Sequence, residues 1–461
     1  MDWIEEIKNL MGNEIISTKS DVLRNYASDY TEDLEFLPEV VAKPQTVKDI
    51  SNILAFCNER SIAVTPRGAG TGLSGGSLPI NGGLSLSMER FNKILDIDEE
   101  NFQATVESGV INDDFQEAVK AKGLFYPPDP ASKGSCFLGG NIAHSSGGPK
   151  ALKYGTTKDY VLNLEVVLAN GEIIWTGANT LKNSTGYNLT QLMIGSEGTL
   201  GVVTKIVFKL LPYPKHNLLM LASFSSINDA CEVVPKMFIA GFNPSALELM
   251  EESAVKFVLK HAPQLSLDYL AQSKAFLLIE VDGNKLDDLF TECEGINEIL
   301  EKHNVLDVQF ADSAASKERL WKIRRSIGEL VKLHSIYKEE DTVVKRANLP
   351  KLMQGVKSLG TEYGFESVCY GHAGDGNLHI NILKGNLTDE EWNGPHLEEG
   401  IRKIFRLCKE LGGTISGEHG IGFVQKKYLT EVLTKHHIEL MKSIKTSFDP
   451  NGILNPGKIW E

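Results

Sequence analysis

Two histidines, His372 and His379, lie on either side of an Asp375-Gly376 pair. The apolar runs that flank this pair predict two strands, and Asp-Gly between strands is a strong signal for a two-residue hairpin turn. With that turn, residue 372 pairs with residue 379, and their Cβ atoms stand about 4.5–5.5 Å apart on one face. Two imidazoles so placed can share one metal ion at about 2.0–2.1 Å each. Asn381 falls on the same face as His379, because alternate residues of a strand share a face.

A glycine-flanked Glu418-His419 pair offers the carboxylate that such a metal site needs. Two histidines and one carboxylate leave coordination positions open for the oxygen atoms of a substrate. The alternative is that the two segments are unrelated polar loops. Because a Glu-His pair between glycines is hard to place in a hydrophobic core, we favour the metal site. Zinc is the first expectation, and manganese and iron(II) also suit imidazole and carboxylate ligands.

A third segment, residues 66–76, carries five glycines and follows an apolar run that predicts a strand. Glycine at this density lets the backbone adopt positive φ and approach a ligand closely. Successive backbone N–H groups then form an anion-binding nest that suits a pyrophosphate. A Rossmann loop for a nicotinamide dinucleotide would need a helix that starts at its third glycine. Residues 77–83 contain a proline and two more glycines and cannot propagate a helix, so we exclude that alternative.

The elements that must position these groups divide the chain in two. Three glycine-rich blocks, at 66–76, 137–148 and 194–201, lie among short strands and amphipathic helices. Beyond about residue 214 the glycines thin out, and strands and helices follow an antiparallel α+β pattern. The expected strands are 61–65, 161–169, 217–225, 275–281, 305–310, 365–370 and 378–383, and the expected helices are 47–60, 112–122, 227–240, 285–303, 397–409 and 427–448. We predict an α+β fold with a first domain at 1–214, a second at 215–404, and a C-terminal, largely helical segment at 405–461 that returns to the first domain.

The composition is that of a folded protein and excludes several classes. Apolar residues make up 42% and charged residues 23% of the 461 residues, and the formal net charge is −14. A net negative chain repels phosphate backbones, so nucleic-acid binding is not expected. The first residues lack the pattern of a secretory signal, no apolar stretch reaches about 18 residues, and none of the six cysteines forms a CxxC pair. We therefore expect a cytoplasmic protein without a membrane span or an iron–sulfur cluster.

The sequence PRGAGTGLSGG at 66–76 resembles the pyrophosphate loop of the flavoproteins related to vanillyl-alcohol oxidase and p-cresol methylhydroxylase. Residues 127–130, 139–148 and 194–203 resemble further segments of that family, in the same order. The resemblance implies that FAD lies in the first domain and that the second domain caps the flavin ring. The first loop has no histidine of the kind that bonds covalently to the flavin in some members, so we expect non-covalent FAD. The residues expected to bind FAD are Pro66, Arg67, Gly68, Ala69, Gly70, Thr71, Gly72, Ser74, Gly75, Pro128, Asp129, Gly139, Gly140, Asn141, Ala143, Ser145, Glu197, Gly198, Gly201, Val203 and Asn455.

The segments GHAGDGNLHIN and GEHGIG narrow the resemblance to one branch of that family. They are similar to D-lactate dehydrogenases, the FAD subunit of glycolate oxidase and D-2-hydroxyglutarate dehydrogenase, over nearly the whole chain. The resemblance implies that His372, His379 and Glu418 are metal ligands and that His419 is the catalytic base. His144, in the second glycine block, we expect to be structural.

The same resemblance assigns the substrate contacts. Asn381 would touch the substrate, and Arg324 would bind its carboxylate, with the neighbouring Arg325 as the alternative. The D-2-hydroxyglutarate branch has further polar groups for a distal carboxylate. Gly328 and the mostly acidic run at 338–341 do not look arranged for that role, which favours a monocarboxylate such as D-lactate or glycolate.

The expected activity is FAD-dependent oxidation of a small D-2-hydroxy acid to the 2-oxo acid. The hydride passes to flavin N5, a divalent metal eases removal of the hydroxyl proton, and His419 accepts that proton. Because the chain has no cysteine cluster, the electrons leave to an external acceptor, which is a quinone, an iron–sulfur partner or an electron-transfer flavoprotein. The alternatives are a D-2-hydroxyglutarate dehydrogenase, an FAD electron-transfer subunit of a multi-subunit glycolate oxidase, and a related flavoprotein acting on another alcohol or an alkyl-phosphate substrate. The histidine pair and the Glu-His pair argue against the last of these.

Overall fold

The computed structural model describes residues 3–461, which divide into two compact units. The first unit contains the residues up to Gly147 together with 156–213 and 418–461, and the second contains 148–155 and 214–417. We expected the changes after residues 214 and 404. The chain leaves the second unit later than expected, because helix α14 (Pro395–Glu410) packs against helix α12 (Leu349–Tyr363) of that unit.

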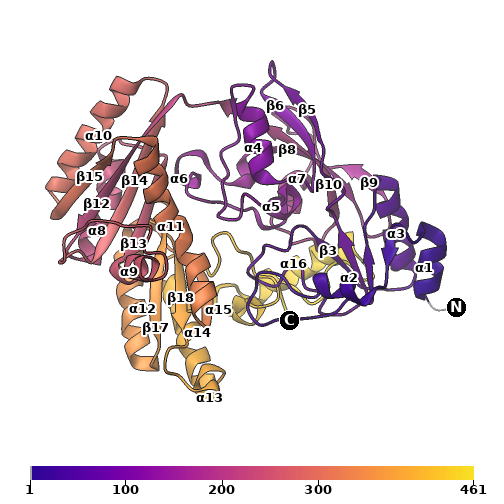
Figure 1. Ribbon diagram of the computed structural model, residues 1–461. Helices are drawn as coiled ribbons and strands as arrows, with labels where there is room; N and C mark the ends of the chain where they lie inside the picture. The colour runs from indigo at the N-terminus through magenta and orange to yellow at the C-terminus, as the bar shows by residue number, and fades with distance from the viewer. Residues whose placement is uncertain (1–2) are drawn as a thin grey trace. The chain divides into compact units, whose positions relative to one another are not determined.

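Two sheets form most of the first unit (Figure 1). The four-stranded sheet has the order β1-β2-β4-β3, and the five-stranded antiparallel sheet has the order β5-β6-β10-β8-β9. The strands are β1 (Ile16–Ser17), β2 (Val40–Ala42), β3 (Val64–Arg67), β4 (Leu84–Ser87), β5 (Ile94–Asp98), β6 (Gln103–Glu107), β8 (Val161–Val167), β9 (Ile173–Trp175) and β10 (Val202–Lys209), with a small pair β7 (Leu124–Phe125) and β11 (Leu211–Pro212). The helices are α1 (Trp3–Met11), α2 (Ser20–Asn25), α3 (Val47–Glu59), α4 (Asn112–Lys120), α5 (Leu138–His144), α7 (Leu189–Met193), α15 (Leu429–Val432) and α16 (Lys435–Phe448).

Local sequence explains why helix α3 forms where it does. Thr46 and Asp49 form a capping box, in which each side chain accepts a hydrogen bond from the backbone amide of the other. The helix then buries Ile50, Ile53 and Leu54 in the core that also contains the four-stranded sheet. The cap and the apolar face together place the turn that leads into β3 and the first glycine block.

The C-terminal segment packs in the first unit, as Figure 1 shows by the yellow helix α16 near β3. Leu454 forms a parallel bridge with Val64 of β3. The prediction of one helix over 427–448 was wrong, because the chain is extended at Leu433 and Thr434 caps a new helix, α16. The segment before that break is a short 3-10 turn followed by α15.

The second unit is built on a seven-stranded antiparallel sheet of order β15-β12-β14-β13-β17-β18-β16. Its strands are β12 (His216–Phe224), β13 (Ala246–Glu251), β14 (Ala275–Gly283), β15 (Val305–Ala311), β16 (Tyr337–Val343), β17 (Glu366–His372) and β18 (Asn377–Leu383). Its helices are α6 (Ala151–Tyr154), α8 (Ile227–Ile239), α9 (Glu252–His261), α10 (Leu286–Glu301), α11 (Ala314–His334), α12, α13 (Asp389–Trp392) and α14. Helices α9 and α11 share one apolar core with the sheet, which includes Leu221, Phe276, Ile323 and Ile327.

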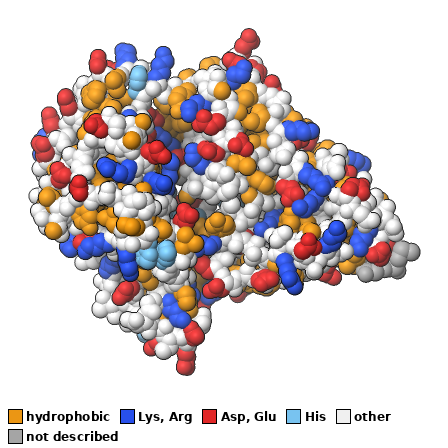
Figure 2. Space-filling model, in the orientation of Figure 1, with side chains coloured by type: hydrophobic (Ala, Val, Ile, Leu, Met, Phe, Trp, Pro, Cys, Tyr) orange, Lys and Arg blue, Asp and Glu red, His pale blue; other side chains and the backbone are white. Residues whose placement is uncertain are grey.

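The expected α+β class is confirmed. No helix within residues 3–461 has both the length and the apolar character needed to cross a bilayer. All six cysteines are buried and unpaired. On the face drawn in Figure 2, acidic and basic side chains are interspersed, so the negative net charge is not gathered in one place there.

Candidate active site

Residues of the three glycine blocks of the first unit line one pocket. Ten of the residues expected to bind FAD line it: Pro66, Arg67, Gly68, Gly139, Gly140, Ala143, Glu197, Gly198, Gly201 and Val203. The lining also includes residues that the sequence analysis did not select: Gly76, Ser77, Met88, Ser108, His144, Met193, Ser196 and Val202. Met88 and Ser108 directly follow strands β4 and β6, outside any glycine-rich segment. Only the packing of these strand ends beside the loops could have identified them.

The first glycine loop has the form of an anion cradle. Gly70 has φ +73°, and a Cβ added there would meet the Arg67 guanidinium. Arg67 is buried and donates to the carbonyl of Ser28 at 2.8 Å, so this side chain braces the loop from behind. Among the interactions within residues 3–461, none uses the backbone amides from Ala69 to Leu73 as donors. A run of such amides in a glycine-rich turn suits a pyrophosphate.

The other glycine blocks bring the backbone equally close. A Cβ on Gly139 would lie 2.7 Å from the Ser108 Cβ, and one on Gly201 would meet the Val166 side chain. Glycine at these two positions lets the loops pack directly against the strands, whereas a Cβ on Gly140, which also lines the pocket, would meet nothing within 4 Å. His144, which we expected to be structural, lines the pocket as well.

Two of the predicted residues brace the loops with their side chains. The Glu197 carboxylate accepts hydrogen bonds from the amides of Ile421 and Gly422, at 2.8 and 2.7 Å. The Asn455 amide donates to the carbonyls of Gly76 and Glu197, at 2.9 and 2.7 Å. The predicted residues outside the lining are Ala69, Gly70, Thr71, Gly72, Ser74, Gly75, Pro128, Asp129, Asn141, Ser145 and Asn455, and their contact with FAD stays a prediction.

A second polar cluster lies on the sheet of the second unit, at the hairpin of β17 and β18. The expected register was wrong: His372 pairs with Asn377, and Tyr370 pairs with His379. The turn spans four residues rather than two, because the Gly376 amide donates to the carbonyl of His372. A shift of two residues keeps every side chain on its face, whereas a shift of one would reverse it. His372 and His379 are therefore diagonal neighbours on one face, with ring centroids 5.4 Å apart.

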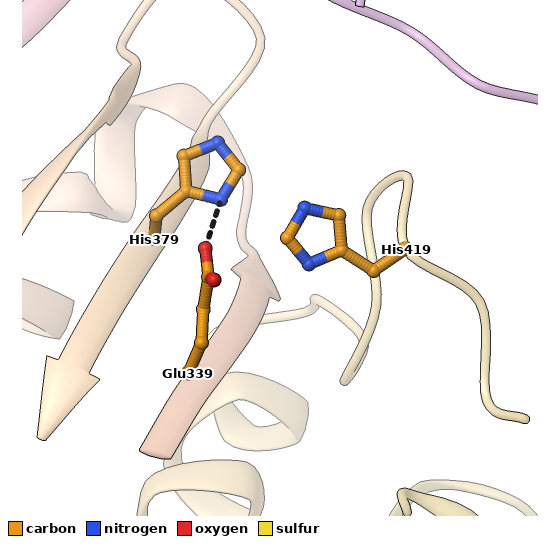
Figure 3. A group of neighbouring side chains, drawn as sticks. All are labelled: Glu339, His379 and His419. Carbon is orange, nitrogen blue, oxygen red and sulfur yellow. Dashed lines mark ion pairs between the residues drawn. The ribbon is translucent and has the colours of Figure 1, made fainter. Parts of the chain in front are cut away.

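Carboxylates surround the two histidines. Glu248 lies opposite His372 on strand β13, and its Oε1 is 2.7 Å from His372 Nδ1. Glu339 and Asp341, on strand β16, each have an oxygen 3.8 Å from His379 Nδ1. Figure 3 shows the Glu339–His379 ion pair between these neighbouring strands.

The carboxylates of this cluster are shielded from solvent. The side chains of Glu248, Glu339 and Asp341 are at most 9% exposed. Divalent metal ions accept imidazole nitrogens and carboxylate oxygens as ligands. The donor set therefore suits a divalent metal ion.

Arg324 and Asn381 lie in the same cluster. Arg324, on helix α11, forms an ion pair of 2.7 Å with Glu248 and stacks over the Tyr370 ring at 4.8 Å. Arg325, the alternative, is exposed and stacks on Trp321 instead. Asn381 is fully buried, and neither its Oδ1 nor its Nδ2 has a hydrogen-bond partner among the described residues. A buried amide with both polar atoms unsatisfied is rare and marks a place where a ligand or water binds.

The protonation of Glu248 follows from these contacts. Burial opposes ionisation of this carboxyl, but the charges of His372 and Arg324 outweigh burial and hold its pKa below the ordinary value. Glu248 is therefore an anion that accepts a hydrogen bond from His372 and forms an ion pair with Arg324. In a neutral imidazole the proton then stays on His372 Nδ1, and Nε2 presents its lone pair.

The Glu418-His419 segment is held at both ends. The amide of Gly417, the last residue of the second unit, donates to Asp341 at 2.8 Å. Glu418 and His419 open the C-terminal part of the first unit, where the His419 carbonyl accepts from the Ser74 hydroxyl at 3.0 Å.

Family models match most of the chain. The model described as "FAD binding domain" matches residues 38–177, and the model described as "FAD linked oxidases, C-terminal domain" matches residues 213–459.

Three curated relatives cover nearly all of the chain. Glycolate oxidase subunit GlcD of Bacillus subtilis (strain 168) is 40% identical over 460 residues, which are 100% of this chain and 97% of the relative. D-lactate dehydrogenase of Anaerostipes hadrus is 39% identical over 427 residues, 92% of this chain and 89% of the relative. D-2-hydroxyglutarate dehydrogenase of Xanthomonas citri pv. viticola is 33% identical over 448 residues, 97% of this chain and 94% of the relative.

The fold also matches solved structures. A structure of p-cresol methylhydroxylase with substrate bound has a TM-score of 0.82 at 18% identity and covers 99% of this chain and 96% of that one. A structure of 4-ethylphenol oxidase from Gulosibacter chungangensis has a TM-score of 0.79 at 18% identity, with 100% and 97% covered. At this identity the match shows the fold alone.

Proposed function

Because the chain belongs to the family of FAD-linked oxidases, we propose that it oxidises a small D-2-hydroxy acid, D-lactate or glycolate, to the 2-oxo acid. The observation that carries this proposal is Asn381, a fully buried amide with no partner among the described residues, beside a histidine pair and a buried arginine. A hydroxy acid has one carboxylate for an arginine and one hydroxyl for an amide and a metal. The names of the relatives point to the same substrate class.

FAD fits the glycine pocket of the first unit. The amides of 69–73 suit its pyrophosphate, and the backbone at Gly140 borders open space in the pocket for the rest of the cofactor. When bound, FAD supplies the acceptor for the hydride that leaves the substrate. The first loop holds Thr71 and Ser74 but no histidine, so we expect the cofactor to be non-covalent.

We expect His372, His379 and Glu418 to hold the divalent metal, with zinc favoured over manganese and iron(II). His372 is fixed by Glu248 so that Nε2 can coordinate. Glu418 directly follows Gly417, whose amide is held by Asp341 beside His379, so covalent continuity keeps its carboxylate within reach. The metal would supply Lewis acidity that lowers the pKa of the substrate hydroxyl.

The side chains of the chain itself then have separate tasks. Arg324 binds the substrate carboxylate and sets the direction of the α-hydrogen. Asn381 donates to or accepts from the substrate oxygens. His419 accepts the hydroxyl proton, a role worth about 10²–10⁴-fold in rate for a general base. Helix α11 and strand β18 are regular elements, which hold the two substrate contacts rigidly.

The substrate is a monocarboxylate for three reasons. A Cβ on Gly328, one turn after Arg324 on α11, would lie 2.6 Å from the Tyr370 hydroxyl, so no polar side chain fits there. Lys338 lies on the other face of strand β16, where its amine donates to the Trp392 carbonyl at 2.6 Å, so it does not face the cluster to bind a second carboxylate. Glu339 is the register partner of Asn381, and its negative charge opposes a second carboxylate. D-2-hydroxyglutarate is therefore the less favoured substrate.

The test is anaerobic bleaching of the bound flavin by a panel of hydroxy acids. D-lactate or glycolate should bleach it, L-lactate and D-2-hydroxyglutarate should do so much more slowly, and chelation of the metal should stop bleaching while FAD stays bound. A panel in which no hydroxy acid bleaches the flavin would refute the proposal. Fast bleaching by D-2-hydroxyglutarate would correct the substrate, and full activity without metal would remove the metal from the mechanism.

A second candidate is the FAD subunit of a larger glycolate oxidase, which the printed name of the Bacillus subtilis relative favours. In either case the electrons leave to an external acceptor, namely a quinone, an iron–sulfur partner or an electron-transfer flavoprotein. Steady-state turnover of the isolated chain with an artificial acceptor separates the two. Turnover by the chain alone supports the first candidate, and turnover only with a co-purified partner supports the second.

A further inference from the structure

Glu248 is a buried ionised group whose contact with Arg324 has no role in the proposed function. It lies inside strand β13, is 0% exposed, and contacts two residues with different proposed roles. One carboxylate oxygen is 2.7 Å from His372 Nδ1, and the other is 2.7 Å from an Arg324 nitrogen. A buried carboxylate with no water contact is unfavourable unless its partners compensate it. Its position between these two residues therefore calls for an explanation.

We propose that Glu248 is a positioning residue that fixes His372 for the metal and Arg324 for the substrate carboxylate at the same time. The inference rests on the proposed function for the role of Arg324. The pairing of two strands fixes the contact between Glu248 and His372. Glu248 and His372 are direct partners across β13 and β17, so the contact follows from the sheet and not from a flexible side chain alone. A carboxylate that holds the second nitrogen of a metal-binding histidine sets its tautomer and ring orientation.

Helix α11 positions Arg324. Trp321, one turn before Arg324, donates its indole N–H to Glu280 at 2.8 Å. Glu280 is on β14, where it also contacts Lys150 and Ser245. The helix is thus anchored to the sheet independently of Glu248. The contact with Glu248 determines the direction of the Arg324 guanidinium and leaves its other donors for another anion. The Nε of Arg324 has no hydrogen-bond partner among the described residues.

Glu280 supplies a matched control, because it too is a buried carboxylate that ties α11 to the sheet. Among residues 3–461, the hydrogen bonds and ion pairs of Glu280 involve neither the histidine pair nor Arg324. The test compares Glu248→Gln with Glu280→Gln, each purified with FAD. Zinc affinity is measured by competition with a chromophoric chelator, and KM and kcat are measured for D-lactate at limiting and at saturating zinc.

We expect Glu248→Gln to keep FAD, to bind zinc roughly 10–100-fold more weakly, and to raise KM about tenfold, the loss of about one charge-assisted contact. Saturating zinc should restore much of kcat and none of the KM defect, a split that general loosening of the fold does not produce. Glu280→Gln should lower thermal stability and leave zinc affinity and KM within about twofold of wild type.

If Glu248→Gln does not fold, Glu248→Asp replaces it, since the shorter carboxylate keeps the charge and cannot reach both partners. Zinc affinity within twofold of wild type in the folded variant, or equal losses in Glu280→Gln, would overturn the proposal. So would a wild-type protein that binds no zinc, manganese or iron(II). If wild type binds metal but none of the hydroxy acids reduces its flavin, the proposed function fails. The zinc affinities alone then decide the role of Glu248.

Discussion

Replacing Asn381 by leucine should stabilise the protein while it removes activity. Asn381 is fully buried, and both polar atoms of its amide are unsatisfied. A buried polar group without a partner costs about 1–3 kcal/mol, and leucine has nearly the same shape without that cost. In the absence of substrate we therefore expect Asn381→Leu to be more stable by about 1–2 kcal/mol. For a domain of this size, that corresponds to a rise in Tm of roughly 2–8 °C.

Asn377→Leu is the matched control on the same face of the same strand. Its amide donates to Asp341 at 2.7 Å and to the Thr342 carbonyl at 2.9 Å. Loss of one hydrogen bond to a charged group and one to a neutral group should destabilise by about 2–4 kcal/mol. The two substitutions are chemically identical, so the opposite signs of their effects come only from the partners of each amide.

The assay is thermal unfolding of both variants with and without D-lactate, followed by anaerobic flavin bleaching. Asn381→Leu should bleach at least about 100-fold more slowly than wild type, since an active-site amide donor is worth about 10²–10³. Substrate should raise the Tm of wild type and not that of Asn381→Leu. If Asn381→Leu loses as much stability as Asn377→Leu, the reasoning is refuted, because Asn381 would then have a structural partner.

The remaining predictions concern the glycine loop, one lysine and the thiols. Gly70→Ala should lower FAD affinity at least about tenfold, since φ +73° costs an L-residue about 1–2 kcal/mol and the new Cβ meets Arg67. Gly123→Ala, with the same φ and open space around the new Cβ, should keep FAD. Equal FAD content in the two purified variants would contradict this. Burial lowers the pKa of Lys458 to about 8. Between pH 8 and the ordinary lysine pKa, the folded state therefore binds fewer protons than the unfolded chain, so its stability rises with pH. The urea midpoint of unfolding should rise with pH in that window for wild type, and rise less for Lys458→Met. Burial raises the pKa of Cys57 to about 12, and all six cysteines are buried, so a thiol reagent at about pH 8 should label fewer than one thiol per native chain and all six after denaturation.

The sequence located the glycine loops well, because glycine density has one dominant physical cause, the close approach of backbone to a ligand. Met88 and Ser108 gave no such signal, since they line the pocket only through the packing of strand ends. The turn between β17 and β18 was predicted with the wrong length. An Asp-Gly pair predicted a two-residue turn, and the observed four-residue turn shifts the register by two. The two histidines still share a face, because the side-chain period of a strand is also two.

Glu248 could not have been found from sequence. The segment Ala246–Glu251 reads ALELME, and its two glutamates are three positions apart, so it lacks the period of two that would predict which face is buried. All six residues are buried, because helices cover the sheet and β13 lies between β14 and β17. Which residue faces Glu248 depends on the pairing of strands more than 100 positions apart, and no local pattern encodes that pairing.

We propose that His372, His379 and Glu418 bind one divalent cation next to the flavin, where the hydroxy acid is oxidised. The most direct measurement is a crystal structure with FAD and D-lactate or its oxidation product, with anomalous diffraction collected at the zinc, manganese and iron edges. We predict a single strong anomalous peak at one of these edges, bonded to all three side chains and to the hydroxyl or keto oxygen of the ligand. A peak elsewhere, no peak at any edge in an active enzyme, or a ligand bound away from Arg324 and Asn381 would contradict the account.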